Sequence, residues 1–379
     1  MQGYATTQGV AIGPTTAHLE CARVWTQVGV ASWRRMRGRR GQGVGRLAGL
    51  GASLRRRAGA VVVDNFFRGA SQLGRLHPAA RPEKHGVQVI RDVPYRDSPH
   101  PAHRLDVYRP DPAVAGTDGP RPVVLYVHGG GFRFMSKDTH WVMGLAFARR
   151  GYLVFNVGYR LSHDAKYPAA IRDVLEAYRW VVAHAADYGG DIDRLVLAGE
   201  SAGANLVTAA TVATTFEREP TWARAAFEVG VVPRAVIAAC GMLQVSDTMR
   251  FARRRRLRPF VVDRLVEVPE AYLGKGFAHP RPEADSRLDF ADPLVVLESA
   301  ETPARPLPPF FAPVGTRDPV LDDTRRLAKA LRRRGVPCED RYYPGQIHAF
   351  HAFVIAPTAR RCWADTYAFL DRALATDGS

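Results

Sequence analysis

The segment 195–205 constrains the fold of this chain more than any other. It reads Leu-Val-Leu-Ala-Gly-Glu-Ser-Ala-Gly-Ala-Asn, an apolar strand that leads through the pattern GxSxG into a helix of small residues. A serine at such a tight strand-to-helix turn has a strained backbone conformation, and the glycines two positions before and after it prevent steric collision. The helix N-terminus that follows adds partial positive charge near the hydroxyl. These features predict that Ser201 is a catalytic nucleophile and not an ordinary turn serine.

Short strands and helices alternate along most of the chain. The first two predicted strands alternate apolar and polar residues, as half-exposed antiparallel strands do, and the later ones are continuously apolar, as strands covered on both faces are. This order predicts an α/β fold in which helices cover both faces of a mostly parallel sheet. The predicted strands are 87–93, 104–108, 123–127, 153–157, 195–198, 235–239, 309–314 and 338–343, and the predicted helices are 139–150, 168–187, 202–216, 320–334 and 358–375.

Three consecutive glycines follow the predicted strand 123–127, in the sequence HGGGF at 128–132. Glycine lets backbone N–H groups point into a cavity at φ values that other residues avoid. A flexible hairpin turn is the alternative, which the helical pattern after the glycines disfavours. We expect His128 to shape this loop and not to act as a base. The loop and the nucleophile turn together supply the candidates for an oxyanion hole, which are the N–H groups of Gly129, Gly130, Gly131 and Ala202.

A serine nucleophile needs a base, and the base needs an acid that orients it. In hydrolases of this chain order, both follow the nucleophile at the ends of strands. Asp318 comes just after one predicted strand and His348 just after the next, so the two side chains are predicted to meet above the sheet edge. Asp322 and Asp323 are rival acids inside a predicted helix, and His351 is a rival base one helical turn later. Asp318 and His348 are preferred because of their positions at strand ends.

The alternation breaks between residues 242 and 306. This stretch carries six Arg between 250 and 258, then apolar residues at helical spacing and Pro-rich loops. We interpret it as a helical insertion or lid. A cationic lid would steer acidic ligands toward the site, but a run of like charges is more often a solvated face.

Positive charge is concentrated near the N-terminus. The whole chain has a net charge of +16, and residues 21–60 contain ten Arg and no acidic residue. We therefore divide the chain into a basic arm, 1–80, and a catalytic domain, 81–379. Between 24 and 67 the arm has apolar residues at loose helical spacing, which suits one or two amphipathic helices on an anionic membrane surface. A packed or solvated tail is the alternative. Nucleic-acid binding is not expected, because no recognition module is present.

Composition and cysteine spacing exclude several classes of protein. Hydrophobic residues make up 46% and charged residues 24% of the chain, which is ordinary for a globular protein. No apolar stretch is long enough for a membrane-spanning helix, and no secretory signal is evident. The expected location is therefore the cytoplasm or a peripheral position on a membrane or the cell envelope. The four cysteines are widely separated, which predicts neither a disulfide framework nor a zinc site.

Four motifs lie in order along the chain: HGGGF at 128–132, GESAGAN at 199–205, RDPV at 317–320 and GQIHAF at 345–350. Together with YRL at 159–161 they resemble the hormone-sensitive-lipase-like family of α/β-hydrolase esterases. The resemblance covers residues 86–379.

The resemblance implies an α/β-hydrolase fold with an eight-stranded sheet and a cap built from N-terminal residues and the insertion 242–306. It implies a carboxylesterase that acts on short or medium acyl chains. By position, Ser201 is implied to be the nucleophile, Asp318 the orienting acid and His348 the base. The implied oxyanion donors are Gly130, Gly131 and Ala202.

These observations together predict a serine ester hydrolase whose substrate is a small-molecule ester. The predicted mechanism needs neither a metal nor an organic cofactor. An amidase or peptidase with the same three groups is one alternative, because pocket shape and proton delivery select the leaving group. A non-catalytic receptor on the same fold is another, disfavoured because the chain retains all three candidate residues.

Overall fold

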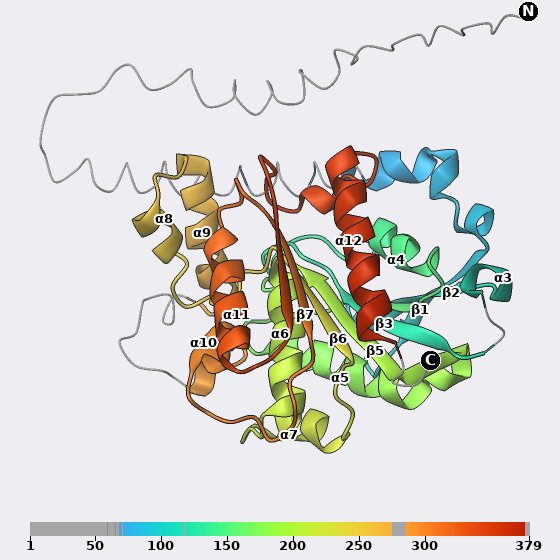
Figure 1. Cartoon of the computed structure of the whole chain (residues 1–379), viewed down its shortest axis with the longest axis horizontal. Coiled ribbons are helices and arrows are strands. Elements are labelled where there is room, and N and C mark those ends of the chain that lie inside the picture. Colours follow the sequence, from blue (N-terminus) through green and yellow to red (C-terminus); the bar gives the residue numbers. More distant parts are fainter. Residues whose placement is uncertain are drawn as a thin grey trace, which may run out of the picture. The chain divides into compact units, whose positions relative to one another are not determined.

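An eight-stranded sheet forms the centre of the fold. The structure is a computed structural model that describes residues 71–116, 119–274 and 286–375, together with Gly59, Asn65, Arg68 and Gly69. The strand order is β1-β2-β4-β3-β5-β6-β7-β8 (Figure 1). β2 runs antiparallel to both of its neighbours, and the other neighbouring pairs are parallel. This confirms the predicted mostly parallel sheet of eight strands, which are β1 (Val87–Pro94), β2 (Arg104–Pro110), β3 (Arg121–Val127), β4 (Leu153–Val157), β5 (Gly190–Glu200), β6 (Ala235–Ala239), β7 (Phe310–Gly315) and β8 (Cys338–Tyr343).

The central strands end at the same level of the sheet. Val127, the last residue of β3, pairs with Val157 of β4 on one side and with Gly199 of β5 on the other. Glu200 at the end of β5 pairs with Ala239 at the end of β6. The carboxyl ends of parallel strands share one edge of a sheet, where ligands bind in open α/β folds. The glycine loop after β3 and the serine turn after β5 are therefore neighbours.

Helices cover both faces of the sheet. Successive residues of β5 point to opposite faces, as the two-residue repeat of a strand requires. Leu195 and Leu197 join the larger apolar cluster, and Val196 and Ala198 join a second one. The larger cluster includes residues of α5 (Ala169–His184), α6 (Ala202–Thr215) and α11 (Leu321–Arg333), and the second includes residues of α4 (Trp141–Ala148) and α12 (Pro357–Ala373).

The helix that follows Ser201 lies deep in the fold. Every residue of α6 is buried, which explains why this helix is built from alanine, glycine, threonine and short apolar residues. At Gly203 a side chain would place its Cβ 2.0 Å from the carbonyl oxygen of Val127. Only glycine therefore lets α6 approach the end of β3 so closely, and this approach brings the serine turn up to the glycine loop.

The insertion 242–306 contains α8 (Arg250–Arg254), α9 (Pro259–Tyr272) and α10 (Pro293–Glu298). Figure 1 shows α8 and α9 together at one end of the fold, near α11. The third helix, α10, packs against α6 and α11 and so belongs with the body of the domain.

The arginine run at 250–258 is not one continuous solvated face. Extended backbone at Arg255 separates α8 from α9. Arg250 is buried and binds the carboxylate of Asp323 on α11, whereas Arg253 and Arg254 are exposed. The buried pair fixes α8 to the body of the domain.

Several short helices were not predicted from the sequence. α3 begins at a proline and α7 directly follows one. Both helices are too short for a hydrophobic repeat to be recognised in the sequence. These elements are α3 (Pro112–Ala115), α7 (Thr221–Glu228) and the 3₁₀ turns η1 (Pro78–Ala80), η2 (Pro82–His85), η4 (Ser286–Leu288) and η5 (Phe350–Ala352). The 3₁₀ turn η3 (Ala185–Tyr188) follows α5 and, except for Tyr188, lies within the predicted helix 168–187.

Most of the predicted basic arm lies outside the described residues, including nearly all of the stretch 24–67 predicted to form amphipathic helices. Residues 71–76 are helical. There the indole N–H of Trp141 donates to Ser71 Oγ at 3.0 Å, and Arg75 donates to the carbonyl of Asp138 at 2.6 Å. In the part of the chain that the structure describes, no helix is both long enough and apolar enough to span a bilayer.

Candidate active site

Ser201 occupies a strained turn between β5 and α6. Its φ is 54° and its ψ is −114°, a conformation that residues with a side chain rarely adopt. A backbone hydrogen bond ties the turn to the neighbouring strand, because the N–H of Ser201 donates to the carbonyl of Ala239, the last residue of β6, at 2.9 Å. The side chain is half-buried, so Oγ is presented at the sheet edge and not inside the core.

The structure brings the three predicted catalytic side chains together. His348 Nε2 lies 2.9 Å from Ser201 Oγ. On the other side of the ring, Nδ1 lies 2.9 Å and 3.0 Å from the two carboxylate oxygens of Asp318. Asp318 is fully buried just after β7, and Oδ1 also accepts the N–H of Val320 at 2.9 Å. Because a carboxylate only accepts, Nδ1 carries the proton and Nε2 is free to take one from the serine.

The charge of Asp318 tunes the histidine. Burial lowers the pKa of His348, but the charge and hydrogen bond of Asp318, together with the charge of Glu200, more than offset this, so the pKa lies above its ordinary value. A raised pKa makes the imidazole a stronger base, and the imidazolium formed after proton transfer is stabilised by the same carboxylate.

The rival residues lie elsewhere. Asp323 accepts the N–H of Leu243 at 2.8 Å and binds Arg250, and Asp322 faces arginine side chains on α8 and α11. His351 is buried with its Nε2 2.8 Å from a carboxylate oxygen of Glu200. Among the described residues, none of these three forms a hydrogen bond with Ser201.

The glycine loop after β3 has the backbone geometry that glycine alone provides. Gly130 has φ of 106° and Gly131 has φ of 58°. A side chain at Gly130 would place its Cβ 2.1 Å from the carbonyl oxygen of Phe134. The predicted oxyanion donors at Gly129, Gly130, Gly131 and Ala202 thus lie on two adjoining turns, and within the described residues no acceptor is found for the N–H of Gly130 or Gly131.

His128 shapes the loop as a neutral ring. It is buried, stacks on Tyr159 with ring centroids 4.2 Å apart, and donates from Nδ1 to the carbonyl of Gly129 at 2.8 Å. Burial, with the neighbouring His140, lowers the pKa of His128 to about 3. An imidazole with so low a pKa, held away from the serine by these contacts, is not suited to act as the general base.

Helix α9 of the insertion 242–306 packs against the glycine loop. The rings of Phe132 and Tyr272 are stacked with centroids 3.7 Å apart. A Cβ at Gly131 would lie 3.3 Å from a methyl group of Val268. Arg255, between α8 and α9, donates to the backbone carbonyl of Asp318. The insertion therefore contacts both the glycine loop and the predicted acid.

Among the described residues, one group of possible metal ligands includes two of the predicted catalytic residues. The donor atoms of Cys240, Asp318 and His348 lie within 4.8 Å of one another. Asp318 and His348 already bind each other, and burial, with Asp318 and Glu200, raises the pKa of the Cys240 thiol well above its ordinary value. The hydrogen bonds from Ser201 through His348 to Asp318 already account for the closeness of these groups.

Sequence reasoning missed the role of Glu200, the variable residue of GxSxG. It is buried, and His140 Nε2 donates to its Oε1 at 2.8 Å. Burial raises the pKa of Glu200, but the neighbouring histidines lower it more, so the pKa falls below its ordinary value. A carboxylate in an otherwise apolar strand end was the available signal, because buried charges need partners.

A family model described as alpha/beta hydrolase fold matches residues 124–352 of the chain. A versiconal hemiacetal acetate esterase of Dothistroma septosporum is 27% identical over 303 residues, which cover 79% of this chain and 84% of that protein. An acetyl esterase of Salmonella dublin is 30% identical over 246 residues, covering 64% of this chain and 68% of the relative.

A solved structure gives the same grouping. An esterase from the bacterial hormone-sensitive lipase family is 26% identical, with a TM-score of 0.57, over 76% of this chain and 86% of that one. The sequence motifs, the sheet order and these similarities agree. The chain therefore belongs to the alpha/beta hydrolase fold family and is an ester hydrolase of its hormone-sensitive-lipase-like group.

Proposed function

We propose that this enzyme cleaves short- to medium-chain carboxylic esters through an acyl-enzyme intermediate on Ser201. The observation that carries the proposal is the continuous hydrogen-bonded chain from Ser201 Oγ through the His348 ring to the Asp318 carboxylate. This is the arrangement that serine hydrolases use to activate a hydroxyl near neutral pH.

Each step in the proposal follows from this geometry. Ser201 Oγ attacks the ester carbonyl carbon while its proton passes to His348 Nε2. The oxygen that becomes negative is held by the N–H groups of the glycine loop and of Ala202. His348 then gives its proton to the leaving alcohol as the C–O bond breaks. Water attacks the acyl-enzyme while His348 takes its proton. As the bond to Ser201 Oγ then breaks, His348 returns this proton to Oγ, which releases the acid and restores the free serine.

The preference for short acyl groups rests on two observations. The relatives named above are esterases of acetyl and acetate esters, and this chain matches 68% and 84% of their lengths. In this chain, α9 packs closely against the glycine loop at Val268 and Tyr272, which limits the space beside the predicted oxyanion hole. We infer that small acyl groups fit there best.

A fluorophosphonate probe and an ester series test the proposal. The probe is expected to label Ser201, as found by mass spectrometry of the labelled peptide. p-Nitrophenyl esters are expected to react fastest from acetate to hexanoate, with kcat/KM falling for longer chains because they exceed the pocket. Acyl anilides of the same acids are expected to react far more slowly. Labelling of another residue excludes the mechanism, and faster anilide cleavage identifies an amidase.

The Arg-rich stretch 21–60 supports a second proposal, that the chain binds anionic membrane surfaces peripherally. Each Arg near such a surface contributes about 1 kcal/mol, and salt screens the attraction. The full chain is expected to sediment with phosphatidylglycerol-containing vesicles at low salt and to be released at high salt. Phosphatidylcholine vesicles are the control, together with a full-length variant whose ten Arg in this stretch are replaced by Gln. Equal binding by the variant contradicts the proposal.

A further inference from the structure

Glu200 is a buried carboxylate beside the nucleophile that no step of acyl transfer uses. Its side chain is only slightly exposed, at 6%. Oε1 accepts the Nε2–H of His140 at 2.8 Å. Oε2 lies 2.8 Å from Nε2 of His351, a close polar contact whose angles do not make it a hydrogen bond. Burying an anion is costly unless partners compensate it. Here the two partners come from segments on either side of the predicted active site.

The first partner segment is the one that carries the glycine loop. A Cβ built at Gly129 would lie 3.0 Å from the carbonyl oxygen of Glu200 and 3.2 Å from its Cγ and its Oε1. Glu200 thus packs directly under the loop. His140, just before α4, is itself held, because its Nδ1 lies 3.2 Å from the carbonyl of Ser136 and 3.0 Å from Thr139 Oγ1. Glu200 therefore contacts the loop at Gly129 and binds His140 in the segment that follows the loop.

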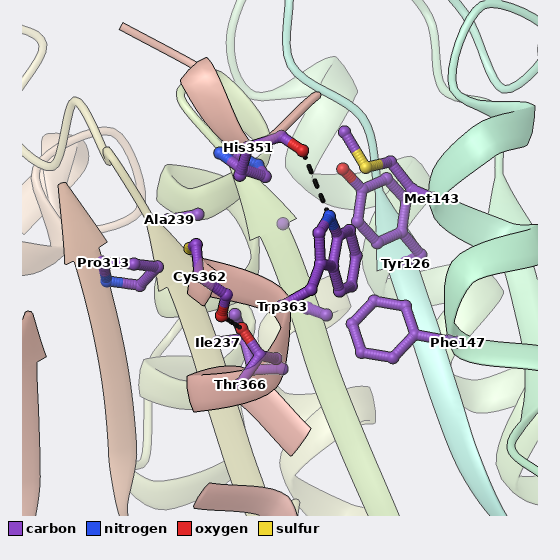
Figure 2. Close-up of a pocket in the computed structure, with 12 residues that line it drawn as sticks. Tyr126, Met143, Phe147, Ile237, Ala239, Pro313, His351, Cys362, Trp363 and Thr366 are labelled. Atoms are coloured by element: carbon purple, nitrogen blue, oxygen red, sulfur yellow. Dashed lines mark hydrogen bonds between the residues drawn. The ribbon is translucent and has the colours of Figure 1, made fainter. Parts of the chain in front are cut away.

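The second partner segment carries the base. His351 lies in η5, three residues after His348, and Ala349 between them has a left-handed backbone with φ of 54°. The indole N–H of Trp363 on α12 donates to the carbonyl of His351 at 3.1 Å, as the dashed line in Figure 2 shows. The hydrogen bond from Trp363 fixes the backbone of His351, and its ring lies at ion-pair distance from Glu200. Together these contacts restrain the short turn that leads back to His348.

The cavity next to His351 is part of this packing and not a ligand pocket. Figure 2 shows His351 and Trp363 beside Tyr126, Met143 and Phe147 around it. Its volume is about 20 Å³, which is room for about one water molecule. An acyl chain does not fit there.

The charge of Glu200 also acts on the base. The two histidines keep the pKa of Glu200 below its ordinary value, although burial opposes this, so the carboxylate stays ionised. After Asp318, Glu200 is the second negative group that raises the pKa of His348. The other titratable groups that face Glu200 are His128, His140, His351, Tyr126, Tyr159 and Cys240.

We propose that Glu200 is a positioning residue of the active site. It clamps the glycine loop, through Gly129 and His140, to the turn that carries His348, through His351, and it places a second buried negative charge near the imidazolium that forms during acyl transfer. This inference rests on the proposed serine mechanism. It gives Glu200 two roles: to hold the oxyanion donors and the base at the right distance from each other, and to raise the basicity of His348.

The test compares Glu200→Gln with Glu200→Asp in the full chain. Glutamine keeps the length but removes the charge, so kcat is expected to fall about 10- to 100-fold, the cost of a small misplacement of reacting groups, with KM nearly unchanged. The acid limb of kcat/KM is expected to move to lower pH, because His348 loses one of the charges that raise its pKa. Aspartate restores the charge but is one methylene shorter, so it is expected to restore the acid limb and only part of kcat.

Asp173→Asn is the matched control. Asp173 on α5 is also a fully buried carboxylate, and Arg160, in the segment between β4 and α5, binds it. We expect this variant to lower the melting temperature while leaving the acid limb in place. If Glu200→Gln behaves in the same way, with wild-type kcat and an unmoved acid limb, Glu200 is merely structural and the inference is wrong.

A readout independent of turnover separates this inference from the proposed mechanism. NMR titration of the His348 ring in the full chain is expected to show a lower pKa in Glu200→Gln than in the wild type, whichever substrate is used. If the wild type hydrolyses no ester or Ser201 is not labelled, the serine mechanism fails while the titration still tests Glu200. An unchanged titration together with unchanged kcat overturns the inference alone.

Discussion

Replacing Ser201 or His348 with alanine is expected to lower kcat on p-nitrophenyl acetate by about 10⁴- to 10⁶-fold. Either change breaks the contact of 2.9 Å between Oγ and Nε2 on which proton transfer depends. The two losses are expected not to add in the double variant, because serine and histidine act as one unit. Stopped-flow and steady-state kinetics on purified protein, with melting temperatures for each variant, make the measurement.

The controls use the same residue types away from the site. Ser299 ends α10 and its hydroxyl donates to the carbonyl of Val296, and His184 ends α5 beside Asp187 on the surface. Ser299→Ala and His184→Ala are expected to keep kcat within about twofold, as surface changes usually do. Near-normal turnover in Ser201→Ala or His348→Ala, with the fold intact, removes that residue from the mechanism. Hydrolysis that stays above the uncatalysed rate in both variants is expected from the oxyanion donors alone.

The body of the sheet could be predicted because its signals are local. Continuous apolar runs between turn residues predict the bounds of β4 and β6 as the structure has them. The start of β5 was placed five residues too late, at Leu195 instead of Gly190. The missed residues are mostly polar, and they join the sheet because Gly190 pairs with Arg121 before a register shift. Pairing with a distant strand decides this boundary, and no local pattern records it.

The candidate site could be predicted for a related reason. Parallel strands end at one edge, so residues at strand ends converge whatever lies between them in sequence. That rule places Asp318 and His348 near Ser201. It does not place Glu200, His140 and His351 together, because two of these lie in irregular segments whose approach depends on side-chain packing. The sequence pattern also does not show that the arginine run is interrupted at Arg255. Arg250 is buried because it binds Asp323, which lies on a helix 73 residues further along the chain.

Asp318→Asn is expected to lower kcat by about 10⁴-fold with little loss of stability, the scale seen when a triad histidine is held in the wrong tautomer. In the wild type, Oδ1 accepts the N–H of Val320 while Nδ1–H of His348 donates to the carboxylate. An asparagine whose carbonyl oxygen keeps the Val320 contact turns its NH₂ toward Nδ1. The ring then accepts at Nδ1 and carries its proton on Nε2, where it cannot take one from Ser201.

The pH profile distinguishes this effect from simple loss of packing. The acid limb of kcat/KM reports the base of the free enzyme, and Asp318 raises the pKa of His348 above its ordinary 6.5. Wild-type activity is therefore expected to fall as the pH drops through a value above 6.5. In Asp318→Asn the negative charge that raises the pKa of His348 is gone, while the burial that lowers it remains. The acid limb of kcat/KM is therefore expected to move to lower pH, and the maximum activity is expected to fall. Asp322→Asn, four residues later on α11, removes an equal charge outside the hydrogen-bonded chain. It is expected to change neither the position of the acid limb nor the maximum activity. If both variants shift the limb equally, general surface charge and not the Asp318–His348 contact sets the base strength.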